Sequence, residues 1–106
     1  MLDWINKQYA QVNILASVCT GALLLAECGI LNDKNATIHY MDLDRLENDY
    51  PRVKVIRKVK FVDQGNLLTS AGISAGINMS FHIISRLFGL EIAKQTAERM
   101  EYDIAL

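Results

Sequence analysis

The sequence predicts an α/β fold in which helices cover a mostly parallel β-sheet. Short apolar segments with the composition of strands alternate with amphipathic helical patterns, which is typical of layered α/β domains. A pair of short strands in the second half adds an antiparallel hairpin. With 106 residues, of which 51% are apolar and 22% charged, the chain can form one folded domain and does not have the composition of a disordered tail.

The first half alternates between helix and strand. Leu2, Ile5 and Tyr9 recur at helical spacing, and the apolar run after Val12 has the composition of a strand buried on both faces. Gly29 and Pro51 are expected to end helices. The expected elements are a helix over Leu2–Tyr9, a strand over Asn13–Val18, a helix over Thr20–Cys28, a strand over Ala36–Tyr40 and a helix over Asp42–Asp49.

In the second half, three short strands precede two helices. The turn from Asp63 to Asn66 has the residues of a hairpin turn. Ile77, Phe81, Ile84 and Phe88 recur at helical spacing, and Gly89 is expected to break that helix. The expected strands are Val53–Ile56, Val59–Val62 and Leu67–Thr69, and the final helix is expected over Glu91–Met100.

Charge and hydropathy argue against two classes of partner. A formal net charge of -1 does not favour bulk electrostatic binding to nucleic acid or to an anionic membrane. The apolar run from Ile14 to Leu31 contains Gly21 and Glu27, which favour a strand, a turn and a helix over a membrane span. Because no basic segment precedes an apolar stretch at the N-terminus, we expect a cytoplasmic protein.

Cys19 is the strongest chemical signal in the chain. An apolar strand ends at Cys19, Gly21 follows, and a helix begins at once, which is how a nucleophile elbow is built. The helix N-terminus stabilises a negatively charged thiolate, and the backbone N–H of Thr20 is placed to donate to an oxyanion. The alternative is a small buried side chain at the end of a strand.

His39 is expected to share a sheet edge with Cys19, because the carboxyl ends of parallel strands meet at one edge. There its imidazole could activate the thiolate, and the alternative is a histidine bonded locally. Cys28 lies at the far end of the helix after Cys19, too far away for a disulfide, and is expected to be structural. Two histidines and two cysteines without clustering predict no metal site.

Two other patterns have simpler explanations. Gly72, Ser74 and Gly76 satisfy the G-x-S-x-G pattern of hydrolase nucleophiles, but the only later histidine, His82, has no acid between it and Ser74. Ser74 is therefore expected to cap a helix, and the glycines to permit close packing. Five basic residues between Arg52 and Lys60 are expected to form a solvated strand edge rather than an anion site.

Several blocks of the sequence resemble the DJ-1/PfpI superfamily. They are VCTGALLLA (18–26), ATIHY (36–40) and DQGNLLTSAGISAGIN (63–78), and with RMEYD (99–103) the pattern is most similar to the isonitrile-hydratase-like branch. The ligand-sensing domains of AraC-type regulators share much of it. The resemblance implies a flavodoxin-like three-layer sandwich that is usually dimeric.

The resemblance also assigns roles to three residues. Cys19 matches the family's reactive cysteine, Thr20 the residue whose amide serves the oxyanion site, and His39 a histidine near that cysteine. By the same comparison, residues 1–106 are expected to be the C-terminal portion of a DJ-1/PfpI-like domain. The N-terminal strands, with the family's acidic residue and a Gly-rich loop, are not found in this sequence.

The function implied by the resemblance is cysteine-dependent hydration of an isonitrile to an N-substituted formamide, with a small electrophilic substrate and no cofactor. We expect little or no activity from this chain alone, and either a homodimer or a complementing N-terminal half as its partner. The alternatives are a metabolite-sensing domain of an AraC-type regulator, or glyoxalase, deglycase or amidase chemistry on Cys19. No binding of nucleic acid or membrane by this chain is expected.

Overall fold

The computed structural model describes residues 1–103 and contains two small sheets. In the larger sheet, β5 (Leu67–Ser70) lies between β1 (Leu15–Ser17), which runs parallel to it, and β4 (Phe61–Asp63), which runs antiparallel. In the smaller sheet, β2 (Asn35–Ala36) pairs in parallel with β3 (Lys54–Val55). The predicted hairpin is therefore confirmed, because β4 and β5 are joined by a tight turn.

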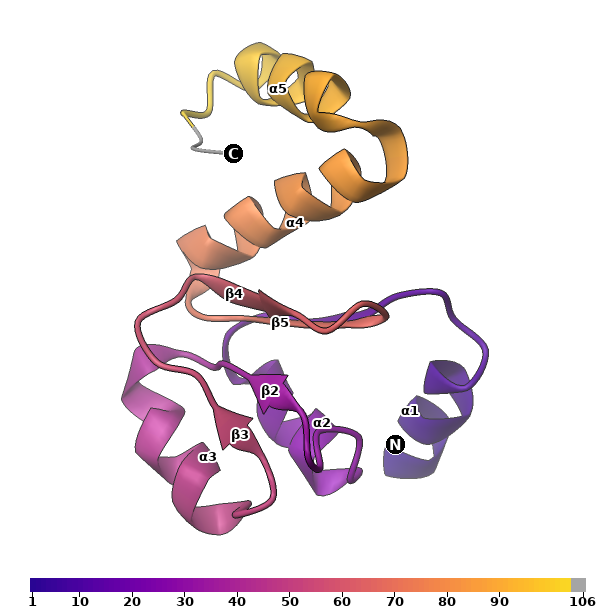
Figure 1. The fold of residues 1–106 in the computed structure, drawn as a ribbon, viewed down its shortest axis with the longest axis vertical. Coiled ribbons are helices and arrows are strands. Elements are labelled where there is room, and N and C mark those ends of the chain that lie inside the picture. Colours follow the sequence, from indigo (N-terminus) through magenta and orange to yellow (C-terminus); the bar gives the residue numbers. More distant parts are fainter. Residues whose placement is uncertain (104–106) are drawn as a thin grey trace.

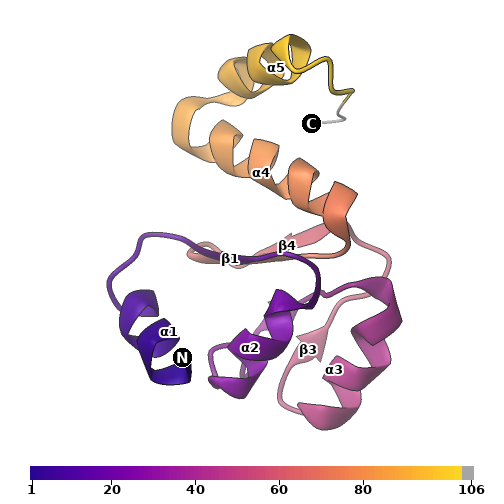
Figure 2. The ribbon, with the colours of Figure 1, turned by 180° about the vertical axis from the view of Figure 1, so that it is seen from behind.

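Helices cover both faces of the larger sheet (Figure 1, and from behind in Figure 2). The helices α1 (Leu2–Tyr9), α2 (Ala22–Glu27) and α3 (Leu43–Asp49) lie on one side, and α4 (Ile73–Phe88) lies on the other. The last helix, α5 (Leu90–Arg99), packs against α4 rather than against a sheet. The predicted α/β class and flavodoxin-like three-layer arrangement are confirmed.

The hydrophobic core lies where the first three helices meet the strands. Leu25 of α2, Leu46 of α3 and Leu67 of β5 belong to one cluster, with Ile38 from the segment after β2. Burying each of these side chains stabilises the fold by about 1.5–3 kcal/mol relative to leaving it exposed. This packing fixes β1 beside β5, in a register that pairs Ser17 with Thr69.

Most predicted elements match the structure to within two residues at each end, and the strand predicted over Ala36–Tyr40 is the exception. Strand pairing stops at Ala36, because the backbone N–H of Thr37 donates to the side-chain Oγ1 of Thr69 at 2.9 Å instead of joining a ladder. A 3₁₀ turn, η2 (Tyr40–Asp42), then begins where the strand was expected to end.

The apolar run from Ile14 to Leu31 is divided between short elements. It forms β1, a 3₁₀ turn η1 (Cys19–Gly21) and the six-residue helix α2. Within residues 1–103, no helix has both the length and the apolar character needed to cross a membrane.

Candidate functional site

Cys19 lies at a sharp turn between β1 and α2. Val18 is extended, with φ −120° and ψ 138°, whereas Cys19 has a φ of +58°, in the left-handed region that residues other than glycine rarely adopt. Holding a cysteine there costs about 1–3 kcal/mol, which the surrounding structure must offset. The backbone N–H of Cys19 donates to the carbonyl of Ala71 at 2.9 Å and ties the turn to the end of β5. This is the backbone geometry of a nucleophile elbow.

Thr20 follows the cysteine in η1, and its backbone N–H has no hydrogen-bond partner within residues 1–103. The next N–H, that of Gly21, donates back to the carbonyl of Val18 at 3.0 Å. A free N–H directly after a nucleophile is the kind of donor that stabilises an oxyanion in acyl-transfer sites. The backbone of Thr20 is thus available for the role that the sequence predicts.

His39 caps the turn η2 with its imidazole. Its Nδ1 accepts a hydrogen bond from the backbone N–H of Met41 at 3.3 Å. A ring nitrogen that accepts a hydrogen bond has no proton, so the neutral ring carries its proton on Nε2. The Nε2 side of the ring lies near Gly72, where an added Cβ would come to 3.4 Å from Cδ2 and 3.9 Å from Nε2 of His39. In this arrangement the neutral ring of His39 presents Nε2 as a hydrogen-bond donor.

An open cavity brings Cys19 and His39 together. It has a volume of about 710 Å³, in the range of small-molecule sites, and Tyr40, Lys60 and Ile73 also line it. Thr20, the third residue predicted for the site, is not among the lining residues, although it adjoins Cys19. None of the described residues that line this cavity is Asp or Glu. Within the described chain, the cavity thus provides a thiol, an imidazole and an ammonium group, but no carboxylate.

The Gly72–Gly76 segment is a packing feature beside this cavity. An added Cβ at Gly76 would lie 2.7 Å from Cγ1 of Val18, so the close approach of α4 to the elbow requires glycine there. The predicted close packing is confirmed at this position. The prediction that Ser74 caps the helix is wrong, because α4 begins at Ile73 with Gly72 as its N-cap and without a side-chain capping bond.

Cys28 is remote from the cavity. Both cysteines are free, and the Cys28 thiol donates to the carbonyl of Leu2 at 3.7 Å. Burial raises the pKa of the Cys28 thiol, and the charge of Glu27 raises it further. A raised pKa leaves little thiolate at neutral pH, which fits the structural role predicted for this residue.

Asp63, His82 and Arg86 form an ionic cluster that the sequence patterns did not predict. The Asp63 carboxylate lies 2.7 Å from His82 Nε2 and 3.2 Å from Arg86 Nη1, and it accepts a hydrogen bond from the N–H of Gly65 at 2.7 Å. Burial raises the pKa of Asp63, but these hydrogen bonds and the charge of Arg86 outweigh it and hold the pKa below its usual value. The cluster fastens the β4–β5 hairpin to α4. The spacing of His82 and Arg86, one helical turn apart, was the only signal for it in the sequence.

Lys60 is the member of the basic run that reaches the cavity. Arg52 and Arg57 form ion pairs with exposed acidic residues, as expected for a solvated edge. Lys60 has no acidic partner within residues 1–103, and its backbone carbonyl accepts a hydrogen bond from Ala71 at 2.8 Å. The hairpin register therefore places Lys60 opposite the segment that leads into α4. Extending the predicted hairpin by that register is the sequence signal that could have placed Lys60 at the cavity.

A parallel strand ends at a strained cysteine beside the end of a second strand, and a helix follows. This arrangement defines an α/β protein with a cysteine elbow. The DJ-1/PfpI family model matches residues 1–86, and this chain belongs to that family. The resemblance seen in the sequence blocks is thereby confirmed.

The relatives include both enzymes and regulators. An isonitrile hydratase from Pseudomonas putida is 38% identical over 102 residues, which are 95% of this chain and 43% of the hydratase. The HTH-type transcriptional regulator CdhR from Pseudomonas aeruginosa is 30% identical over 99 residues, 93% of this chain and 29% of the regulator. A crystal structure of a ThiJ/PfpI family protein from Pseudomonas syringae superimposes with a TM-score of 0.85 at 26% identity, covering 99% of this chain and 42% of that one. The chain spans less than half the length of each of these relatives.

Proposed function

We propose that this chain carries the nucleophile of an isonitrile-hydratase-like enzyme, which converts an isonitrile and water into an N-substituted formamide. The observation that carries the proposal is the strained Cys19 elbow at a cavity large enough for a small electrophile. The similarity to an isonitrile hydratase at 38% identity supports the choice of reaction.

In the proposed reaction, the Cys19 sulfur bonds to the isonitrile carbon, and the thiol proton passes to that carbon to give a thioformimidate. The oxygen of a water molecule then bonds to the same carbon while one water proton passes to nitrogen. The carbon–sulfur bond breaks, and the other water proton returns to the sulfur. One water is consumed, and no oxidant or reductant is needed. Thr20 is assigned to hold the attacking oxygen through its backbone N–H, which is unpaired within residues 1–103.

A carboxylate for these proton transfers has to come from outside the described cavity, because none of the described residues that line it is acidic. In the described sheet, β1 pairs with β5 on one side only, and an open strand edge of this kind favours pairing with another strand. We assign residues 1–106 to the C-terminal portion of the domain, completed by an N-terminal half or by assembly as a homodimer. We also propose a cytoplasmic setting, where cysteines that do not pair stay reduced.

Formamide production tests the proposal. The chain is incubated with tert-butyl isonitrile, alone and together with the part of the Pseudomonas putida hydratase that this chain does not match, and the formamide proton is followed by NMR. We expect little formamide from the chain alone and clear production by the mixture. Replacing Cys19 by Ala should abolish production, whereas the matched Cys28→Ala variant should retain it. Formamide production that is unchanged in Cys19→Ala would contradict the assignment of the nucleophile.

The second candidate is a metabolite-sensing domain of an AraC-type regulator, which the similarity to CdhR favours. A sensor binds its ligand without consuming it, so the Cys19→Ala variant should bind as well as the natural chain does. No formamide from the complemented chain, together with reversible ligand binding that survives Cys19→Ala, would favour the sensor over the enzyme.

A further inference from the structure

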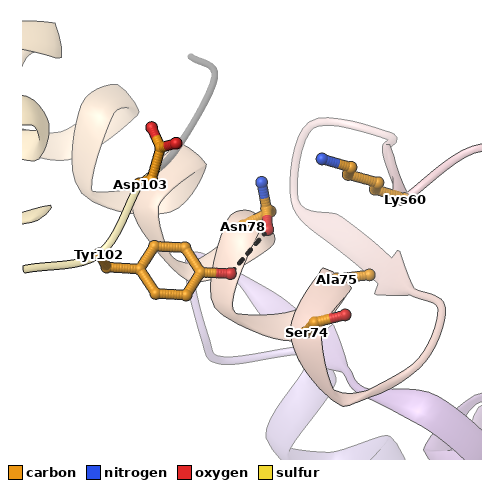
Figure 3. Close-up of a pocket in the computed structure, with 6 residues that line it drawn as sticks. All are labelled: Lys60, Ser74, Ala75, Asn78, Tyr102 and Asp103. Carbon is orange, nitrogen blue, oxygen red and sulfur yellow. Dashed lines mark hydrogen bonds between the residues drawn. The ribbon is translucent and has the colours of Figure 1, made fainter.

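A second cavity of about 320 Å³ adjoins the one that contains Cys19 (Figure 3). Lys60, Ser74 and Ala75 line both cavities, so a ligand can extend from one into the other. Asn78 and Tyr102 line the second cavity beyond these shared residues. The second cavity is therefore a continuation of the Cys19 site and not a separate surface feature.

Asn78 presents an unpaired donor to this cavity. Its residue is only 8% exposed, and its Oδ1 accepts a hydrogen bond from the Tyr102 hydroxyl at 3.3 Å. That bond sets the orientation of the amide, so the NH₂ group faces away from Tyr102, and within residues 1–103 it has no acceptor. Figure 3 shows the amide nitrogen of Asn78 and the ammonium of Lys60 directed into the same space. Because the nitrogen is not among the fully buried polar atoms, it keeps some contact with the open cavity and can donate to an acceptor on a ligand there.

Lys60 and Ser74, which line the part of the cavity next to Asn78, are also donors. Lys60 supplies a positive charge without an acidic partner in the described chain, and the Ser74 hydroxyl is exposed in the first turn of α4. The free N–H groups of that first turn add the positive end of a sixteen-residue helix. Asp103 also lines the cavity, but Figure 3 places its carboxylate on the far side of Asn78 from Lys60. A cation, an amide NH₂ and a hydroxyl together match the two oxygens of a carboxylate.

We propose that Lys60, Ser74 and Asn78 form a subsite for a carboxylate carried by the same small molecule whose reactive carbon lies at Cys19. On the proposed hydratase function, on which this part of the inference rests, the substrate is an isonitrile that bears a carboxylate. The carboxylate sets specificity and position, and the chemistry stays at the sulfur of Cys19.

The binding test uses product-like probes that need no turnover. The ¹⁵N-labelled chain is titrated with N-formylglycine and with its neutral analogue N-formylglycinamide, and NMR follows the Asn78 side-chain amide and the backbone amides of Ser74 and Ala75. We expect N-formylglycine to shift these signals and to bind about tenfold more tightly than the amide, as a charge-assisted hydrogen bond allows. Lys60→Met should remove that preference, and Lys60→Arg should restore most of it.

Lys54→Met is the matched control, because Lys54 is exposed in β3 and lines neither cavity. Equal affinities for the two probes in the natural chain, or equal effects of Lys60→Met and Lys54→Met, would overturn the subsite.

Propanoate, which has a carboxylate but no formamide, separates the subsite proposal from the hydratase proposal. Propanoate that shifts Asn78 in a chain whose complemented form makes no formamide supports the subsite and counts against the hydratase. Formamide production with no preference for a carboxylate-bearing isonitrile supports the hydratase and counts against the subsite.

Discussion

Replacing Gly76 by Ala should destabilise the protein, because it forces a contact between α4 and the cysteine elbow. The added Cβ would lie 2.7 Å from Val18 Cγ1, 3.4 Å from Val18 Cγ2 and 3.6 Å from Ser70 Oγ. Cγ1 of Val18 is attached to a β-branched carbon next to the backbone, so it cannot move away by rotation of a long side chain. Either Val18 or the start of α4 has to shift, and Val18 is the residue before Cys19.

The size of the effect follows from two opposing terms. Overpacking by one methyl group costs about 1–3 kcal/mol. Alanine gains about 0.5–1 kcal/mol over glycine inside a helix, so the net loss in the free energy of unfolding should be about 0–2.5 kcal/mol. Shortening Val18 to Ala removes the clashing methyl groups, so the overpacking term should disappear in the Val18→Ala/Gly76→Ala double variant. The coupling energy between the two sites should therefore be about 1–3 kcal/mol in favour of the double variant.

The double-mutant cycle can be measured by urea unfolding followed by far-ultraviolet circular dichroism, with the melting temperature as a second reading. A loss of 1 kcal/mol corresponds to a decrease of about 4–8 °C for a domain of this size. Ser74→Ala is the control from the same segment, and as an exposed substitution without a capping bond it should change stability by less than about 0.5 kcal/mol. Additive effects of the two substitutions, or a Gly76→Ala variant more stable than the natural chain, would refute the reasoning.

Two further predictions concern charged and nucleophilic side chains. Because the folded pKa of Asp63 lies below its ordinary value of 3.8, the stabilisation that its charge provides is present above about pH 4 and is lost as the pH falls through the folded pKa. Asp63→Asn should therefore lower the free energy of unfolding at pH 7 by about 0.5–1.5 kcal/mol, and urea titrations should show the difference shrinking below pH 4. Iodoacetamide should label Cys19 before Cys28 at neutral pH, because burial raises the pKa of Cys28; peptide mass spectrometry showing the reverse order would contradict this.

The features that sequence predicted well are local ones. A strand, a cysteine, a glycine two residues later and a helix are consecutive in the chain, so the elbow at Cys19 could be predicted without any tertiary contact. The hairpin depends on the turn that contains Gly65, whose φ of +90° suits glycine. The turn at Gly65 follows from backbone preference, whereas the order of residues predicts the place of the elbow but not the left-handed φ of Cys19, which its contact with Ala71 helps to hold.

The features that sequence missed depend on side chains far apart in the chain. Strand pairing stops at Ala36 because the hydroxyl of Thr69 takes the N–H of Thr37, thirty-two residues away. Nδ1 of His39 accepts the backbone N–H of Met41, and no spacing rule indicates which ring nitrogen is engaged. In the sequence Lys60 is one of five basic residues between Arg52 and Lys60, and only the register of β4 against β5 places it at the cavity.

The described residues of this cavity include groups that can bind a ligand but few that can transfer protons, and this difference bears on both proposed functions. Hydration has to move a proton from the thiol to carbon and another from water to nitrogen, so it needs a group that accepts and returns protons. Nδ1 of His39 is engaged by the backbone N–H of Met41, and the ammonium of Lys60 can only donate. Recognition of a carboxylate by Lys60, Ser74 and Asn78 needs no such group. On the proposed assignments, this chain therefore holds the nucleophile and the recognition groups, and whether the assembled protein is an enzyme or a sensor depends on whether its remaining part brings a carboxylate to Cys19.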